Sequence, residues 1–294
     1  MLHHYTSLDS LICMLNAYQE NIVKNNYKKR KDFITLWASS IYTMNDPTEM
    51  KYGDDFLRKT IPTIEEKIIG AKGSILDVIK KACVGDMNRN AVQKMITDHF
   101  FNPQKTPYVI SMSHCEDDIV MWNQYGDNCN GVCLSFDDCV AEGLNFKIYA
   151  KNVDYEKKLT DKVLIDLLVK ELQDFADKSS NLNNEELFSE AIVTYSTLLT
   201  IICPFVKNKD FSNEQEYRIS FIDDSFQNVR FRTRNNMIVP YLPIDIPINK
   251  LNKITLGPCC RKEENKRSLQ HLFQALGLNE LEESIEFSKV HYRK

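Results

Sequence analysis

The chain of 294 residues has little glycine and little proline, with nine of each. This scarcity excludes collagen-like and low-complexity proteins, which are rich in both residues. Apolar residues make up 43% and charged residues 27% of the sequence, as in ordinary globular proteins and unlike disordered ones. The length is sufficient for a large core without disulfides or metals. Because domains average about 150 residues, the chain forms either two domains or one interrupted domain.

The sequence also has no strong excess of charge of one sign. It contains 37 basic and 41 acidic residues, which gives a formal net charge of −4. Such a chain has no general attraction to nucleic acid or to an anionic membrane, although a local basic patch can exist. The run 24–31 has five basic residues in eight. This run either contacts phosphates or is a solvated loop.

Several well-known motifs are missing. There is no Gly-x-Gly-x-x-Gly and no phosphate-loop sequence, so we expect neither a Rossmann nor a Walker-type nucleotide site. The Gly-x-Ser-x-Gly motif of hydrolases is missing as well. The nine cysteines form no Cys-x-x-Cys pair, and we therefore expect no metal.

The sequence also shows no recognisable targeting or membrane segment. Its first residues lack the basic stretch, apolar core and cleavage site of a secretory signal. The longest uncharged run, 191–206, is shorter than the ~20 residues that cross a bilayer, so it predicts a buried helix that ends near Pro204. An odd number of scattered cysteines is typical of a reduced compartment. We therefore expect a cytoplasmic protein with no membrane partner.

The apolar periodicity predicts an α+β fold. Segments rich in β-branched and aromatic residues predict strands at 33–39, 108–114, 131–136, 146–155, 216–222, 228–233, 237–242 and 253–257. Helical spacing predicts helices at 7–18, 55–83, 90–101, 159–178, 185–203 and 263–276. Strands cluster around 106–155 and 216–257, with helices between them. This order predicts mixed or antiparallel central sheets rather than a regular alternation of strand and helix.

The same order predicts one interrupted domain over residues 1–294. Its helical insertions are expected at about 55–101 and 159–203. These insertions are the candidate surfaces for a homo-oligomer, although their apolar positions serve equally well as the protein's own core.

Polar residues recur at every second position of two predicted strands. Residues two apart share one face of a strand, so Glu214, Glu216 and Arg218 are expected on one side. Ser111 and Ser113 share a face of their own strand in the same way. These groups form either a polar outer face, with a surface ion pair worth under ~1 kcal/mol, or part of a site.

Further candidate residues lie in three short segments near predicted helices. They are His4, Tyr5 and Thr6; Asn45 and Asp46; and Trp122 and Tyr125. Asp46 is the first residue of the sequence Asp-Pro-Thr-Glu, which is a strong start signal for a helix. Trp122 and Tyr125 share a helix face. We expect Trp122 mainly in the core, whereas Tyr125 is suited to stack against a ring-shaped ligand.

Together these segments resemble a bacterial family catalogued as domain of unknown function 2971. The shared pieces, in order, are His-Tyr-Thr at 4–6, Met-Asn-Asp-Pro-Thr-Glu at 44–49, Ile-Ser-Met-Ser at 110–113, Met-Trp-x-x-Tyr-Gly at 121–126, Gly-Val-Cys-Leu-Ser-Phe at 131–136 and Glu-x-Glu-Tyr-Arg at 214–218. The resemblance extends from residue 3 to the region 256–267. Members of this family occur among phage-defence and abortive-infection genes, so the resemblance implies a role in antiviral defence.

A second resemblance, to ADP-ribosyltransferases, implies a reaction. Residues 4–6 are similar to the His-x-Thr form of the first motif of those enzymes, and 111–113 to the Ser-x-Ser form of the second. Residues 214–216 are similar to the Glu-x-Glu form of the third, in the same order along the chain. The resemblance implies a split central sheet and cleavage of the nicotinamide–ribose bond of NAD, with no metal.

The resemblance also implies roles for individual residues. Glu216 would stabilise the oxocarbenium-like ribose, and Glu214 would orient or deprotonate the acceptor. Arg218 would either pair with the pyrophosphate or orient Glu216. The residues expected to contact NAD are His4 and Thr6 by hydrogen bonds, Tyr5 or Tyr125 by stacking, and Asn45, Asp46, Ser111, Ser113 and Trp122 as the surrounding polar and aromatic groups.

Three functions therefore remain open from the sequence. The first is an NAD-consuming transferase or glycohydrolase that acts as a defence effector. The second is a ligand-sensing or binding module that uses the same polar groove without catalysis. The third is a nucleic-acid-targeting effector that uses the basic run 24–31. For the first, the sequence leaves the acceptor open between protein, nucleic acid, small molecule and water.

Overall fold

The structure is a computed structural model of the chain. It describes residues 1–25, 33–46, 48–66, 68, 74–84, 94–98, 102, 105–142, 144, 148–155, 161–223, 227–234 and 236–292. Most of the basic run 24–31, Pro47 and much of the helix predicted at 90–101 lie outside these residues.

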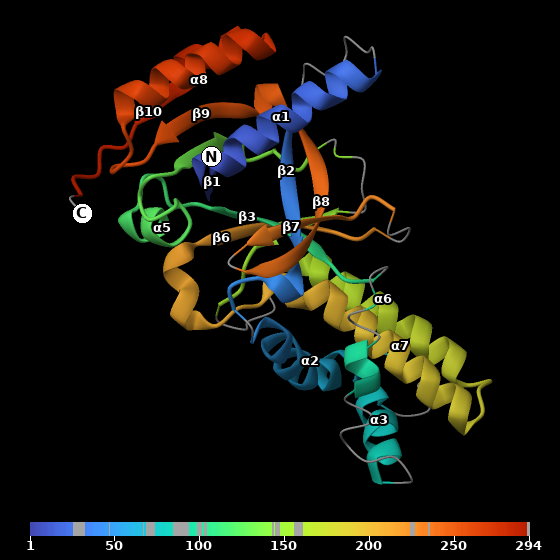
Figure 1. Cartoon of the computed structure of the whole chain (residues 1–294). Helices are drawn as coiled ribbons and strands as arrows, with labels where there is room; N and C mark the ends of the chain where they lie inside the picture. Colours follow the sequence, from blue (N-terminus) through green and yellow to red (C-terminus); the bar gives the residue numbers. More distant parts are fainter. Residues whose placement is uncertain are drawn as a thin grey trace.

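Ten strands form one mixed sheet, which confirms the predicted α+β fold (Figure 1). The strands are β1 (Leu2–Thr6), β2 (Phe33–Ser40), β3 (Tyr108–Ser113), β4 (Val132–Phe136), β5 (Ile148–Asn152), β6 (Glu216–Phe221), β7 (Arg230–Arg234), β8 (Met237–Pro247), β9 (Leu251–Leu256) and β10 (Ile285–Phe287). Their order is β10-β9-β4-β1-β3-β2-β8-β7, and β6 joins β3 to β5. β10 runs parallel to β9. The three-residue β10 is too short to have left a clear sequence pattern.

The sheet is split at β3. β6 pairs with one edge of β3 along its whole length. On the other edge, β1 pairs through His3 with Ser113, whereas β2 pairs at the opposite end with Tyr108 and Val109. β1 then continues along β4, and β2 continues along β8. Two halves of the sheet therefore diverge from the middle of β3, and β2 and β8 run steeply across β3 and β6 in Figure 1.

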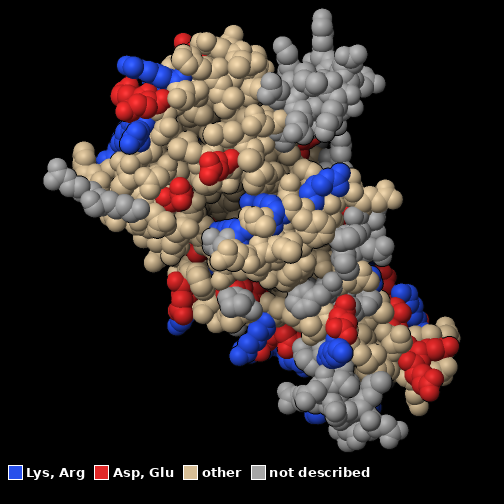
Figure 2. Space-filling model, in the orientation of Figure 1, with Lys and Arg blue, Asp and Glu red and all other residues tan. Residues whose placement is uncertain are grey.

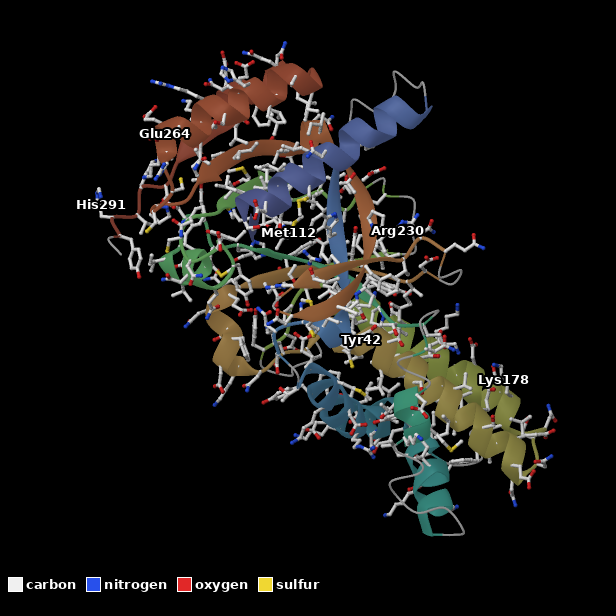
Figure 3. The ribbon with its side chains drawn as sticks, viewed as in Figure 1. Tyr42, Met112, Lys178, Arg230, Glu264 and His291 are labelled. Carbon is white, nitrogen blue, oxygen red and sulfur yellow. The ribbon has the colours of Figure 1, made fainter. Side chains whose placement is uncertain are left out.

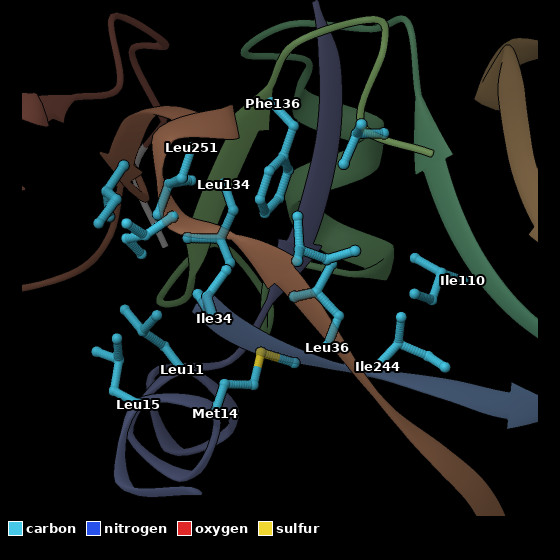
Figure 4. Packing of buried hydrophobic residues seen from close by; sticks show 14 of the residues in the cluster. Leu11, Met14, Leu15, Ile34, Leu36, Ile110, Leu134, Phe136, Ile244 and Leu251 are labelled. Atoms are coloured by element: carbon cyan, nitrogen blue, oxygen red, sulfur yellow. The ribbon is translucent and has the colours of Figure 1, made fainter. Parts of the chain in front are cut away.

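The main apolar core lies on one face of the sheet, against α1 (Leu8–Asn25) and α8 (Lys262–Leu276). Leu11, Met14 and Leu15 form the buried stripe of α1, at the three- and four-residue spacing of a helix face. They pack against Ile34 and Leu36 of β2 (Figure 4). Ser7 caps α1, because its hydroxyl accepts a hydrogen bond from the backbone N–H of Ser10 at 3.1 Å.

Four helices build a second apolar cluster beside the other face. They are α2 (Glu49–Glu65), α3 (Ile75–Val84), α6 (Lys162–Ser179) and α7 (Asn184–Ile202), which lie together below the sheet in Figure 1. α2 and α3 replace the single helix predicted at 55–83. The sequence pattern missed the interruption because apolar residues continue at helical spacing on both sides of it.

α7 ends near Pro204, as predicted. Together with the following turn it forms a 22-residue segment, Asn184–Phe205, that is long and apolar enough to span a membrane. However, 67% of its most apolar stretch is buried inside the protein, as in the core helix of a globular domain.

The short helix α5 (Ile119–Gln124) follows two possible caps in the sequence. Ser113-x-x-Glu116 has the pattern of a capping box, but the side chain of Asp118 accepts the N–H groups of Val120 and Met121. The Ser113 hydroxyl accepts the N–H of Cys115 at 2.9 Å. Asp, Asn, Ser and Thr cap helices almost equally well, so several nearby candidates cannot be ranked from sequence.

Candidate functional site

A cleft of about 680 Å³ opens at the split in the sheet. Met112, which Figure 3 labels near the centre of the molecule, is part of its wall. The polar residues of the wall include His4, Thr6, Ser39, Asn45, Glu49, Ser111, Tyr125, Lys207, Glu214, Glu216, Arg232 and Arg234. Figure 2 shows a hollow near the middle of this face, with basic side chains along one margin and acidic side chains across from them.

The cleft receives side chains from both faces of the sheet. On β1, His3 is paired with Ser113 of β3, and Ser113 is paired with Glu216 of β6, so these three share one face. His4 and Thr6 therefore belong to the opposite face. The cleft brings them together with Ser111 and Glu216 because it passes through the split rather than along one face.

A buried charged cluster forms one end of the cleft. Glu216 accepts a hydrogen bond from Arg218 Nε at 3.0 Å and another from Lys207 Nζ at 3.3 Å. Lys207 Nζ also donates to Glu214 at 2.6 Å. Arg218 donates through both terminal nitrogens to Glu49, at 3.0 and 2.7 Å. Three carboxylates and two cations therefore leave a formal charge of −1 in this buried cluster.

The cations of this cluster determine the protonation of Glu216. Burial alone would raise the pKa of Glu216, but the positive charges of Arg218 and Lys207 outweigh it and lower the pKa. For Glu49, burial dominates and raises the pKa despite the contact with Arg218. Glu216 is thus an ionised carboxylate on the cleft wall at neutral pH.

Glu214 reaches the cluster by a different route from the one predicted. It ends a 3₁₀ turn, Lys209–Glu214, and Gln215 adopts a left-handed backbone with φ 43° before β6 begins at Glu216. Glu214 is therefore outside the strand, and alternation along a strand does not place it. Its backbone carbonyl accepts the Ser113 hydroxyl at 2.6 Å. Of the two interpretations that the alternation left open, an exposed outer face is excluded for Glu216 and Arg218, because both are buried.

Tyr125, at the end of α5, joins the acidic cluster to the cleft wall. Its hydroxyl donates to Glu214 at 2.6 Å. Burial, followed by the negative charge of Glu214, raises the pKa of Tyr125, so the phenol stays protonated and keeps this hydrogen bond. Its ring is half-buried and lines the cleft together with Asn45.

His4 lies where β1 leaves β3. Its Nδ1 is 2.9 Å from the carbonyl oxygen of Ser111. A carbonyl can only accept, so Nδ1 carries the proton, and Nε2 of the neutral ring is an acceptor. Burial lowers the pKa of His4, and the positive charges of Arg232 and Arg234 lower it further. The ring is therefore neutral at pH 7.

The structure brings most of the predicted site residues to the cleft. Those that line it are His4, Tyr5, Thr6, Asn45, Ser111, Tyr125, Glu214 and Glu216. Tyr5 has a second task, because its hydroxyl donates to the carbonyl of Cys115 at 2.8 Å and so fixes the loop before α5.

Four predicted site residues lie behind the wall instead. Trp122 is fully buried, packs edge-on against Tyr5 with ring centres 4.9 Å apart and donates to Asp117. Arg218 is fully buried beneath Glu216. Asp46 is buried in the turn before α2, where its side chain accepts the backbone N–H of Thr48 at 2.8 Å. The fourth is Ser113, which is buried against the backbone of Glu214. The spacing of the sequence motifs identified these side chains, but it does not show how deeply they are buried.

Sequence reasoning assigned no role to four charged residues of the cleft. Glu49 closes the motif Met-Asn-Asp-Pro-Thr-Glu, which was its only signal. Lys207 follows an apolar helix end without a motif. Arg232 lies in the strand predicted at 228–233 and Arg234 directly follows it, and alternating charges of this kind usually form a solvated face. No group of three or more His, Cys, Asp or Glu side chains that could hold a metal ion occurs in the part of the chain that the structure describes.

Comparison with known proteins gives one match. No curated protein and no solved structure matches the chain. The model of the family described as "Protein of unknown function (DUF2971)" matches residues 121–219, which run from α5 to β6 and include Glu214, Glu216 and Lys207. This match supports the resemblance to that family for the part of the chain that carries the acidic end of the cleft.

Proposed function

We propose that the protein is an ADP-ribosyltransferase-like enzyme that cleaves NAD at the nicotinamide–ribose bond, as a cytoplasmic effector of bacterial antiviral defence. The observation that carries this proposal is the ionised carboxylate of Glu216, held by Lys207 and Arg218 on the wall of a cleft at a split sheet. The defence role and the compartment rest on the family resemblance and on the scattered cysteines. Eight of these cysteines are free in the structure.

The geometry suits a dissociative reaction. The bond between C1′ of the ribose and the nicotinamide nitrogen breaks, and its electron pair leaves with the now neutral nicotinamide. The ribose gains positive charge in the transition state, which the ionised carboxylate of Glu216 stabilises. An acceptor or water oxygen then bonds to C1′ and transfers its proton to Glu214, which also orients it.

The other cleft residues act in binding. His4 Nε2 accepts a hydrogen bond from a ribose hydroxyl, because Nδ1 is already engaged by Ser111. Tyr125 provides a ring face for the nicotinamide, with Asn45 and Thr6 beside the same space. Arg218 does not reach the cleft and acts as a positioning residue that holds Glu216.

Nicotinamide release from NAD by the purified chain tests this proposal. Replacing Glu216 by Gln removes the charge while keeping the shape, and should reduce release at least ~100-fold, since transition-state charge stabilisation is lost. Asp127→Asn is the matched control, because Asp127 also lines the cleft but is exposed. Full release by a folded Glu216→Gln variant would contradict the proposal.

One observation favours a second function. Both oxygens of Glu216 already accept hydrogen bonds from cations, as in a site built for rigidity. A binding or sensing module would use the cleft for NAD or a related nucleotide without turnover. In that case the wild-type chain would bind NAD without releasing nicotinamide, and Glu216→Gln would change only the dissociation constant.

A further inference from the structure

Two arginines form the end of the cleft opposite the acidic cluster. Arg232 and Arg234 are two residues apart on β7 and therefore point to the same side of the strand. Both line the cleft, and β7 is held there by its antiparallel pairing with β8. The basic margin of the hollow in Figure 2 lies where Figure 1 draws β7.

Arg232 is fixed in place by its neighbours. Its guanidinium lies 4.7 Å from the ring centre of Trp37 and 5.9 Å from that of Tyr241. One terminal nitrogen donates to the Ser39 hydroxyl at 3.0 Å. An aromatic cradle of this kind orders the planar fork of an arginine before any ligand arrives.

The arginine pair lacks the partners that a half-buried arginine normally has. Arg218, the buried arginine of the acidic cluster, contacts two carboxylates. Arg232 and Arg234 make no ion pair within the described residues, and Nε of Arg232 is buried there without a hydrogen bond. Burial, together with the charge of Arg234, lowers the pKa of Arg232 to about 10, so Arg232 is still a cation at neutral pH. Two cations left together without an anion are unfavourable unless a ligand supplies the negative charge.

The two ends of the cleft thus have opposite charge, with His4 between them. A fitting ligand carries an anionic group at one end and, some distance away, a group that is or becomes positive. We propose that Arg232 and Arg234 bind the diphosphate of a nucleoside diphosphate-containing ligand. This inference rests on the proposed function for the identity of the other end, the nicotinamide riboside of NAD, beside Glu216. Bidentate hydrogen bonds from guanidinium groups are well matched to phosphate oxygens.

ADP and adenosine are probes that separate this inference from catalysis, since neither can release nicotinamide. In calorimetric titrations, the double variant Arg232→Gln/Arg234→Gln should bind ADP at least ~10-fold more weakly than the wild type, while any binding of adenosine stays the same. Arg230→Gln is the matched control. Arg230 lies on the same strand but is exposed, bonds to nearby backbone carbonyls and is labelled at the molecular surface in Figure 3. The single variant Arg234→Gln keeps the contacts of Arg232 with Trp37 and Ser39. It therefore tests the loss of one guanidinium in a chain that should still fold if the double variant does not.

The outcomes also separate the two proposals. Arginine-dependent binding of ADP without nicotinamide release supports the diphosphate site and contradicts the enzyme. Nicotinamide release with the same KM for NAD in wild type and double variant supports the enzyme and overturns the diphosphate site. Equal affinity for ADP in all variants, or no binding of ADP by the wild type, also overturns the diphosphate site.

Discussion

At the scale of single residues, the cleft depends on how Lys207 is placed. This lysine is buried and donates to both Glu214 and Glu216. Without it, two carboxylates would face each other in a poorly hydrated space. Glu216 owes its low pKa to two cations, of which Arg218 is shared with Glu49. Lys207 is therefore expected to matter for stability as well as for the charge of Glu216.

Lys207→Met should lower the free energy of unfolding by about 3–5 kcal/mol, because it leaves buried carboxylates without their partner. Urea denaturation measures this change. Lys178→Met is the control, since it breaks the more exposed contact with Glu190 and should cost less than ~1 kcal/mol. Equal effects of the two substitutions would show that the buried cluster does not stabilise the fold.

His4 predicts how stability depends on pH. Its folded pKa is lower than the ordinary value of 6.5, so the unfolded chain binds the proton more readily. The stability contributed by neutral His4 is therefore present above about pH 6.5 and is lost as the pH falls below it. Burial disfavours the charged form of His4 most, and the positive charges of Arg232 and Arg234 on β7 add to this effect.

Thermal unfolding between pH 7.5 and 5.5 tests this expectation. The melting temperature of the wild type should fall across this range. His4→Gln cannot titrate and retains a donor for Ser111, so its melting temperature should fall less. The melting temperature of His4→Gln should still fall somewhat with decreasing pH, because burial lowers the pKa of His3 too. If the melting temperature of His4→Gln fell with pH as steeply as that of the wild type, the His4 ring would not contribute to the pH dependence of stability.

At the scale of elements, α2 carries Glu49 to Arg218, and its position depends on a glycine. A Cβ on Gly53 would lie 2.4 Å from Sγ of Cys203 and 3.4 Å from the Cα of the same residue. The close approach brings the first turns of α2 against the 3₁₀ turn Cys203–Phe205. That turn also supplies the Pro204 carbonyl that accepts a hydrogen bond from Arg218. The contact therefore links helix packing to the acidic cluster.

Gly53→Ala should destabilise the protein by about 1–3 kcal/mol through overpacking, even though alanine favours helix by up to ~1 kcal/mol. Cys203→Ala removes the clashing sulfur. The double variant Gly53→Ala/Cys203→Ala should therefore be more stable than the sum of the single changes predicts. Strictly additive effects in denaturant titrations would refute the proposed clash.

The positions of most helices and strands were predictable from the sequence, whereas the burial of individual side chains was not. Strands such as 33–39 and 108–114 and helices such as 185–203 follow from periodicity alone, because burial on one face imposes it. Glu214 was wrongly assigned to a strand face, because the left-handed backbone of Gln215 before β6 leaves little trace in a sequence. The burial of Trp122 and Arg218 depends on which elements cover them, and that is decided by tertiary contacts.

At the scale of the whole molecule, the split sheet is what assembles the site. One apolar cluster packs α1 and α8 on one face, and a second packs the helices α2, α3, α6 and α7 beside the other. The cleft passes between the two halves of the sheet, with an acidic end beside β6 and a basic end at β7. The three short motifs of the sequence predicted residues from β1, β3 and the start of β6. The arginines of β7 could not be predicted, because only the crossing of β2 and β8 over β3 brings that hairpin to the cleft.

The most direct test of this account is kcat for nicotinamide release at saturating NAD, compared between the wild type and Glu216→Gln. We predict that kcat falls at least ~100-fold while the dissociation constant of NAD changes less than about threefold, because Glu216 acts on charge that develops only in the transition state. An unchanged kcat would contradict the account, as would an NAD-binding wild type that releases no nicotinamide.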